Sequence, residues 1–163
     1  MQCLGKGVKQ MIVKTEELKN SSGRILSVDF GDVRTGLAVS DASRFLASGI
    51  GYISVGGIAK TAEKVAEIAI EQKVSAVVVG HPVNMDGSLG NRAARAKEFA
   101  ELLDEKLKDL SIYITLFDER MTTMAASRYL NETNTRGKNR KGVIDTLSAQ
   151  IILQNALDRL KNL

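Results

Sequence analysis

Acidic residues at three well-separated places in the chain could do metal chemistry. Asp29 ends a β-rich run, Asp118 and Glu119 close a later one, and Asp145 stands just before a long apolar stretch. Carboxylates presented at the edge of a parallel sheet can hold a divalent cation against a phosphate backbone. The sequence therefore suggests hydrolysis of a phosphodiester, provided that the fold brings these side chains together.

Each acidic position also has a purely structural interpretation. Asp29 would point into the crevice where open sheets bind ligands, but an aspartate there can also organise the following turn. Side chains alternate along a strand, so we expect only one of Asp118 and Glu119 to face a site. Asp145 falls in the first turn of the expected last helix, where the exposed amides favour a carboxylate even without a further role.

Basic residues supply the complementary charge. The chain has 23 Lys and Arg against 19 Asp and Glu, a net charge of +4 that favours acidic partners. Segment 131–142 is basic and polar, so it is either a loop that binds phosphate or a solvated loop. Arg120 could contact a phosphate, or it could pair with whichever of Asp118 and Glu119 faces away from the site. The candidates for backbone phosphate contacts are Arg34, Arg120, Arg136, Lys138, Arg140 and Lys141.

The composition narrows the class of protein. The 163 residues suffice for one hydrophobic core, and the single cysteine, Cys3, excludes an internal disulfide framework. No apolar run resembles a secretion signal or a membrane span, so we expect a cytoplasmic protein. Residues 1–23 are expected to form a loosely ordered leader, and residues 24–163 a single domain. With 4 Phe, 3 Tyr and no Trp, recognition of backbone shape is favoured over base stacking.

Hydrophobic periodicity places these residues on elements. We expect a hairpin, a third strand, and then helices alternating with buried strands before a closing helix. The order indicates an α/β fold with a mixed sheet covered on both faces. The expected ranges are strands 24–30, 35–40, 45–55, 75–80 and 111–117, helices 58–73, 89–107, 121–130 and 143–160, and a loop over 131–142.

His81 is the only histidine and invites assignment as a general base. It stands beside Pro82 at the end of a buried strand, with no nucleophile or acid assigned to it by sequence. We therefore expect a packing or turn role for His81, and a turn and helix cap formed by Asp86 and Ser88.

Taken together, four ordered motifs resemble the YqgF family, also described as Holliday-junction-resolvase-like proteins and pre-16S rRNA nucleases. The resemblance covers roughly residues 24–160, with His81 and the long leader as departures. The motifs are Asp29-Phe30-Gly31-Asp32-Val33-Arg34-Thr35-Gly36, Val79-Gly80-His81-Pro82 with Asn84-Met85-Asp86-Gly87-Ser88, Asp118-Glu119-Arg120-Met121-Thr122-Thr123, and Ile144-Asp145 before Ala149.

This resemblance implies a ribonuclease-H-like fold with a five-stranded mixed sheet and a role in maturing the 5' end of the small-subunit rRNA precursor. Under that hypothesis Asp29, Glu119 and Asp145 are catalytic ligands of Mg²⁺ or Mn²⁺, with Asp118 as the substitute for Glu119. Two ions about 4 Å apart would activate water and stabilise the leaving oxygen. Without metal, the crowded carboxylates should raise one another's pKa values.

Other functions stay open at this point. The substrate could be pre-rRNA, alone or within ribosomal precursor particles, or branched DNA, and the protein could be a monomer or a homodimer. A non-catalytic ribosome-assembly factor could use the same basic surface. An Asp-Phe-Gly segment also occurs in sugar kinases and actin-like ATPases, but those clamp nucleotide between two lobes and this chain has length for one.

Overall fold

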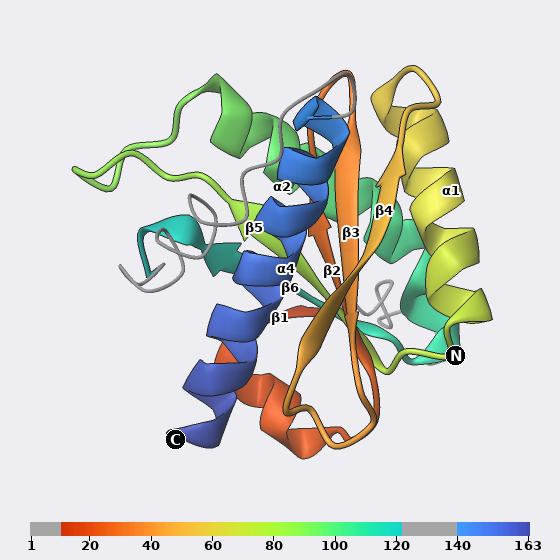
Figure 1. Cartoon of the computed structure of the whole chain (residues 1–163), viewed down its shortest axis with the longest axis vertical. Helices are drawn as coiled ribbons and strands as arrows, with labels where there is room; N and C mark the ends of the chain where they lie inside the picture. Colours follow the sequence, from red (N-terminus) through yellow and green to blue (C-terminus); the bar gives the residue numbers. More distant parts are fainter. Residues whose placement is uncertain (1–10, 122–139) are drawn as a thin grey trace, which may run out of the picture.

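A six-stranded mixed sheet forms the centre of the molecule in the computed structural model, which describes residues 11–121 and 140–163. The strands are β1 (Ile12–Val13), β2 (Ile25–Asp29), β3 (Thr35–Ser40), β4 (Ala47–Ile53), β5 (Ala76–His81) and β6 (Tyr113–Asp118). Their order across the sheet is β1-β6-β5-β2-β3-β4 (Figure 1). The β2–β3 and β3–β4 pairs are antiparallel, whereas β2–β5, β5–β6 and β1–β6 are parallel.

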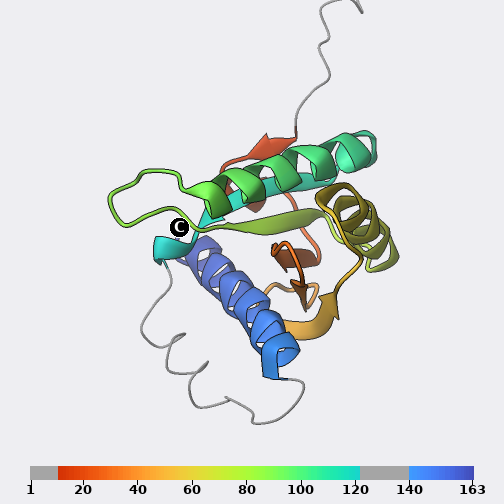
Figure 2. The same cartoon turned by 90° about the horizontal axis from the view of Figure 1, so that it is seen from above.

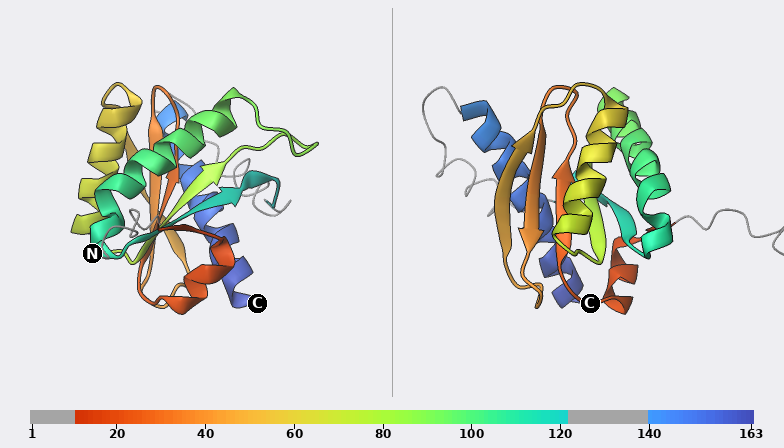
Figure 3. Two further views of the ribbon diagram at one scale, coloured as in Figure 1. Left: turned by 180° about the vertical axis from the view of Figure 1, so that it is seen from behind. Right: turned by 90° about the vertical axis from the view of Figure 1, so that its right-hand side faces the viewer.

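Helices cover both faces of this sheet. Figure 2 shows α1 (Ile58–Glu71) and α2 (Asn91–Leu107) on one side and α4 (Arg140–Lys161) on the other. Three short 3₁₀ helices complete the described elements: η2 (Thr15–Asn20), η3 (Lys108–Leu110) and η4 (Glu119–Met121). The edge-on view in Figure 3 shows the same three layers.

Alternation along the strands divides the core into two clusters. In β5, Val77 and Val79 face the layer of α1 and α2, whereas Ala76 and Val78 face α4. All four side chains are buried, as the unbroken apolar run of this strand predicted. Because β5 lies in the middle of the sheet, its carboxyl end and those of its parallel neighbours β2 and β6 open on one edge.

Residues 11–23, the described part of the expected leader, include β1 and η2 and pack against the rest of the domain. Ile12 and Val13 pair with β6, and Leu18 of η2 is completely buried beneath α4. Met11 donates its N–H to the buried Asp104 carboxylate at 3.1 Å. The sheet consequently has six strands and not five, because the leader adds one edge strand.

The hairpin, the third strand, the two middle helices and the parallel strands agree with the sequence-based expectation. The last helix begins at Arg140, about a turn earlier than expected, so Asp145 is not in its first turn and Arg140 and Lys141 belong to the helix. The expected short helix 121–130 falls, beyond Met121, outside the described residues. Among the described helices, none has the length and apolar character required to cross a membrane.

Candidate active site

Asp29 is the last residue of β2 and stands at the carboxyl edge of the sheet. Its neighbour across the hairpin is Gly36 of β3, and β5 lies on its other side. The side chain is partly buried. Asp29 is thus placed at the carboxyl end of a strand, the end at which open sheets bind ligands.

Glu119, and not Asp118, turns toward Asp29. The Glu119 carboxylate lies over the end of β5, since a Cβ added to Gly80 would stand 3.3 Å from its Oε1 atom. Asp118 is occupied elsewhere: its carboxylate accepts hydrogen bonds from the Arg120 guanidinium, the shortest at 2.6 Å. Of the two acids, Glu119 is the one that lies near Asp29, and its role as a metal ligand stays a prediction.

Asp145 enters the same region from α4. Its backbone carbonyl lies directly against Gly36, where a Cβ would overlap it, and Gly36 is the partner of Asp29 in the hairpin. A hydrogen bond also joins α4 to β2, since the Ser27 hydroxyl donates to the Ala149 carbonyl at 2.6 Å. The small residue in β3 therefore lets the acidic turn of α4 approach the end of β2.

The Asp145 carboxylate is paired with Arg34, whose Nε donates to Oδ2 at 2.9 Å. About a quarter of the Asp145 side chain and a third of the Arg34 side chain stay accessible, at 26% and 31%. Because both side chains keep contact with solvent, screening weakens this ion pair. Arg34, predicted as a phosphate contact, thus holds one of the predicted metal ligands.

Electrostatics join the three acids. Burial raises the pKa of Asp29 to about 7, with the charges of Glu119 and Asp145 adding to the shift and Arg92 opposing it. Burial also raises the pKa of Glu119, again opposed by Arg92. The mutual repulsion predicted for crowded carboxylates is therefore present at Asp29.

The donor set consists of carboxylate oxygens, which suit a hard divalent cation such as Mg²⁺ or Mn²⁺. Within residues 11–121 and 140–163, however, no three acidic, histidine or cysteine side chains stand together as a ready metal site. In this arrangement the Oδ2 atom of Asp145 accepts a hydrogen bond from Arg34. The residues fit a metal chemically, but their side chains need to move.

The other predicted residues divide between the described and undescribed parts of the chain. Arg120 is held by Asp118 and also donates to the Met85 carbonyl at 3.4 Å. Arg136 and Lys138 lie outside the described residues, and the side chains of Arg140 and Lys141 are likewise not described. Of the predicted phosphate contacts, the structure therefore describes the side chains of Arg34 and Arg120.

His81 ends β5, and its Nε2 atom is buried without a hydrogen-bond partner among the described residues. Burial lowers its pKa, an effect that the neighbouring Asp118 opposes. The packing role of His81 stays a prediction. Asp86 accepts the Ser88 N–H at 2.8 Å as expected for a turn, but α2 is capped by Gly90, so the predicted helix cap is wrong.

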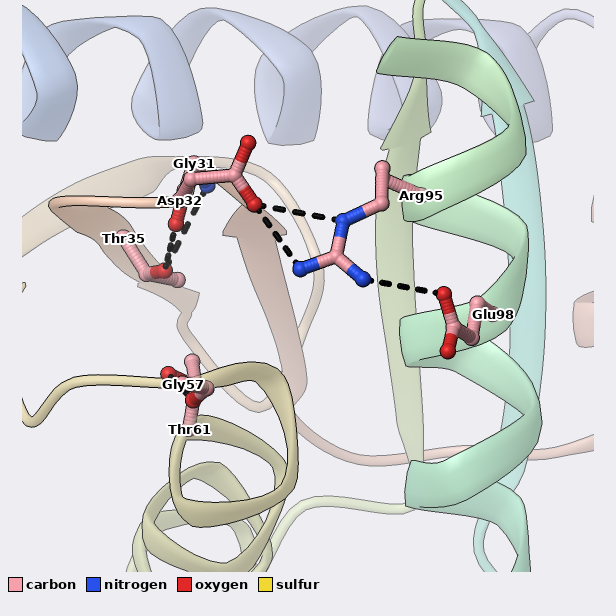
Figure 4. A network of polar contacts seen from close by, with 7 residues as sticks. All are labelled: Gly31, Asp32, Thr35, Gly57, Thr61, Arg95 and Glu98. Atoms are coloured by element: carbon pink, nitrogen blue, oxygen red, sulfur yellow. Dashed lines mark hydrogen bonds and ion pairs between the residues drawn. The ribbon is translucent and has the colours of Figure 1, made fainter. Parts of the chain in front are cut away.

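Two arginines of α2 near this edge escaped the sequence-based prediction. Arg95 donates to Asp32 in the β2–β3 turn at 3.0 Å and to Glu98 at 3.1 Å, a network drawn in Figure 4. Arg92, one turn earlier, acts on Asp29 and Glu119 through its charge. In the sequence, isolated arginines on an amphipathic helix are typical of a solvated face. Their nearness to the acidic residues follows only from the packing of α2 on the sheet.

Comparisons with known proteins agree with this arrangement. The sequence model of the RuvX family, described as Holliday junction resolvase, matches residues 23–159. A protein of Ruminiclostridium cellulolyticum with the provisional name pre-16S rRNA nuclease is 40% identical over 139 residues, covering 84% of this chain and 95% of its own. A protein of the same name from Caldanaerobacter subterraneus subsp. tengcongensis is 43% identical over 141 residues, 85% of this chain and 99% of its own.

Among solved structures, RuvC of T. thermophilus in complex with a Holliday junction substrate superposes with a TM-score of 0.57 at 12% sequence identity. The superposition covers 85% of this chain and 96% of that one. At this identity the similarity concerns the fold, which is that of the RuvC-like, ribonuclease-H-like nucleases.

Proposed function

The chain belongs to the RuvX family of Holliday-junction-resolvase-like proteins, and on that basis we propose that it is a metal-dependent nuclease that hydrolyses phosphodiester bonds. The proposed substrate is the precursor of 16S rRNA, because relatives at 40% and 43% identity over nearly their whole length carry that name. A location in the cytoplasm, where that precursor is made, is part of the proposal.

One observation supports this function above the others. Carboxylates from β2, η4 and α4 gather at the edge where β2, β5 and β6 end, and the charges of Glu119 and Asp145 raise the pKa of Asp29 beyond the effect of its burial. Repelling carboxylates that are partly buried destabilise a fold unless a ligand compensates them. A divalent cation is the ligand that would relieve this repulsion.

Asp29, Glu119 and Asp145 are the residues that would hold Mg²⁺ or Mn²⁺. When bound, such an ion would activate water and neutralise charge on the phosphate. Asp29 and Glu119 must be deprotonated to take part, which their raised pKa values oppose at acidic pH. Binding of the ion by Asp145 would weaken its pairing with Arg34, and the Arg34 guanidinium would then be available to donate to a phosphate oxygen.

Arg120 has a different place in the proposal. Its guanidinium is aligned by Asp118 at 2.6 Å and stands beside the loop that joins β5 to α2. That loop extends away from the body of the molecule at the same edge (Figure 1). We assign Arg120, with Arg34 and the basic residues 136–141, to contacts with the substrate backbone.

A second candidate substrate is branched DNA, because the family model is described as Holliday junction resolvase. A third possibility is a non-catalytic role in ribosome assembly, in which the acids are only structural. Light scattering of the purified protein distinguishes a monomer from a homodimer.

The test is to incubate the wild type and Asp29→Asn with precursor rRNA and with a four-way DNA junction, each with Mg²⁺, with Mn²⁺ and with EDTA. We expect metal-dependent cleavage of the RNA by the wild type only, and binding of the RNA by both proteins. Cleavage confined to the junction would transfer the activity to DNA. Equal cleavage by Asp29→Asn, with contaminating nuclease removed, would refute the assignment of the site.

A further inference from the structure

Arg92 occupies the second position of α2, where a cation is unfavourable for the helix. The N-cap residue is Gly90, no acidic residue lies in the first turn, and the macrodipole places partial positive charge there. Helix stability therefore does not explain an arginine at this position.

The described arginines differ in what they bind. Six of them donate hydrogen bonds to carboxylates, carbonyls or hydroxyls: Arg24, Arg34, Arg44, Arg95, Arg120 and Arg159. Arg92 is exposed and makes no hydrogen bond or ion pair with the described part of the chain. Its five N–H donors are thus available to a ligand.

Contacts one turn further along α2 fix the direction in which Arg92 faces. Residues three apart lie on one face of a helix, so Arg92 shares a face with Arg95. Arg95 binds Asp32 in the β2–β3 turn (Figure 4) and lies 6.0 Å from the centre of the Phe30 ring, which stacks on Phe99 at 4.8 Å. This face of α2 is consequently held against the end of β2.

The charge of Arg92 reaches the acidic site without neutralising it. It lowers the pKa values of both Asp29 and Glu119, but burial outweighs it and both stay raised. The Arg92 guanidinium lies near two carboxylates and pairs with neither. It can therefore bind an anion that enters the acidic site. In a site for phosphodiesters that anion is a phosphate.

Building on the proposed nuclease function, we propose that Arg92 is a further catalytic residue, which donates hydrogen bonds to a non-bridging oxygen of the scissile phosphate. The water oxygen forms a bond to the phosphorus and gives up a proton, while the bond to the leaving oxygen breaks and that oxygen gains a proton. Negative charge grows on the non-bridging oxygens as this happens. Arg92 stabilises that charge.

The test compares Arg92→Ala and Arg92→Lys with Lys106→Ala. Lys106 is an exposed cation in the last turn of the same helix, about 21 Å along the axis, so its removal changes the net charge equally. We expect Arg92→Ala to lower kcat on precursor rRNA about 10²-fold, Arg92→Lys to restore part of it, and Lys106→Ala to match the wild type.

Mn²⁺ binding without nucleic acid separates a catalytic from a structural role. Because Arg92→Ala removes a cation beside the acids, we expect it to bind Mn²⁺ as tightly as the wild type or more tightly. Weaker Mn²⁺ binding would mean that Arg92 only arranges the acids, and unchanged kcat in Arg92→Ala would also overturn the inference while leaving the nuclease function intact. Absence of cleavage by the wild type itself would overturn both.

Discussion

At the scale of single residues, the adjacent acids Asp118 and Glu119 make different contacts. Glu119 turns to the site, whereas Asp118 is neutralised by Arg120 at 2.6 Å. Glu119→Gln should therefore reduce cleavage at least about 10²-fold, as expected for loss of a metal ligand, while Asp118→Asn should reduce it much less. Single-turnover cleavage of the same RNA measures both. A larger loss in Asp118→Asn than in Glu119→Gln would reverse the assignment.

Asp29 should make the stability of the metal-free protein depend on pH. Its pKa is about 7 in the folded state against 3.8 for the free group, so the folded protein keeps a proton that the unfolded chain releases. Stability is thus lost as pH rises from about 4 to about 7. Asp29→Asn removes this loss, and we expect it to exceed the wild type by up to about 4 kcal/mol above pH 7.

Urea unfolding between pH 4 and pH 8 in EDTA measures this difference. Asp118→Asn is the control, because the Arg120 side chain lowers the pKa of Asp118. Parallel curves for the wild type and Asp29→Asn would show that Asp29 is not titrating in this range.

The acids could be nominated from the sequence, but their partners could not. Carboxylates at the ends of elements are visible in the order of motifs, and the strand period already divided Asp118 from Glu119. The pairing of Arg34 with Asp145 joins residues 111 positions apart. Such a contact depends on how α4 packs on the hairpin, which no local pattern contains.

At the scale of elements, close packing of α4 on β3 sets the position of Asp145. A Cβ at Gly36 would overlap the Asp145 carbonyl, and backbone cannot yield as a flexible side chain can. Gly36→Ala should therefore cost about 1–3 kcal/mol of stability and displace the acidic turn, with cleavage falling about 10²-fold.

Gly90→Ala is the matched control for this substitution. Its Cβ would meet only the Asn84 side chain, at 3.6 and 3.7 Å, which is ordinary contact. Thermal unfolding and cleavage rates of the two variants measure the contrast. Wild-type cleavage by a folded Gly36→Ala protein would contradict the role of this contact.

The edge strand β1 is attached through a buried carboxylate of α2. Asp104 is 4% exposed, and its burial raises its pKa. The hydrogen bond that its carboxylate accepts from the Met11 N–H opposes this increase. Asp104→Ala leaves that donor unpaired and should cost about 1–3 kcal/mol, whereas Asp104→Asn keeps an acceptor and should cost less.

Urea unfolding at pH 7 compares these two variants with Glu105→Ala, which removes an exposed neighbouring acid. Equal stability of Asp104→Ala and Glu105→Ala would show that β1 does not depend on this bond.

Periodic elements were predictable, and the short ones were not. Helices α1 and α2 show long apolar stripes, and β5 is a continuous apolar run. Strand β1 has two residues and η2 has six, too few for a repeating pattern. They are ordered because Leu18 and Asp104 bury contacts with distant elements.

At the scale of the whole molecule, the order of the strands in the sheet determines which side chains lie together. Crossovers place β5 between β2 and β6, so residues from both ends of the chain meet at one edge. Sequence alone indicated a mixed sheet with two covered faces, but not which strands are neighbours. The resemblance to a known family supplied the expectation of a common site that element order alone left open.

The most direct test of the shared metal site is a titration of Mn²⁺ into the metal-free protein, with binding measured by calorimetry or electron paramagnetic resonance. We predict that Asp29→Asn, Glu119→Gln and Asp145→Asn each weaken Mn²⁺ binding at least about 10-fold relative to the wild type, because the three carboxylates bind the same ion or ion pair. Asp118→Asn should bind as the wild type does. Wild-type Mn²⁺ affinity in all three variants would contradict a shared metal site.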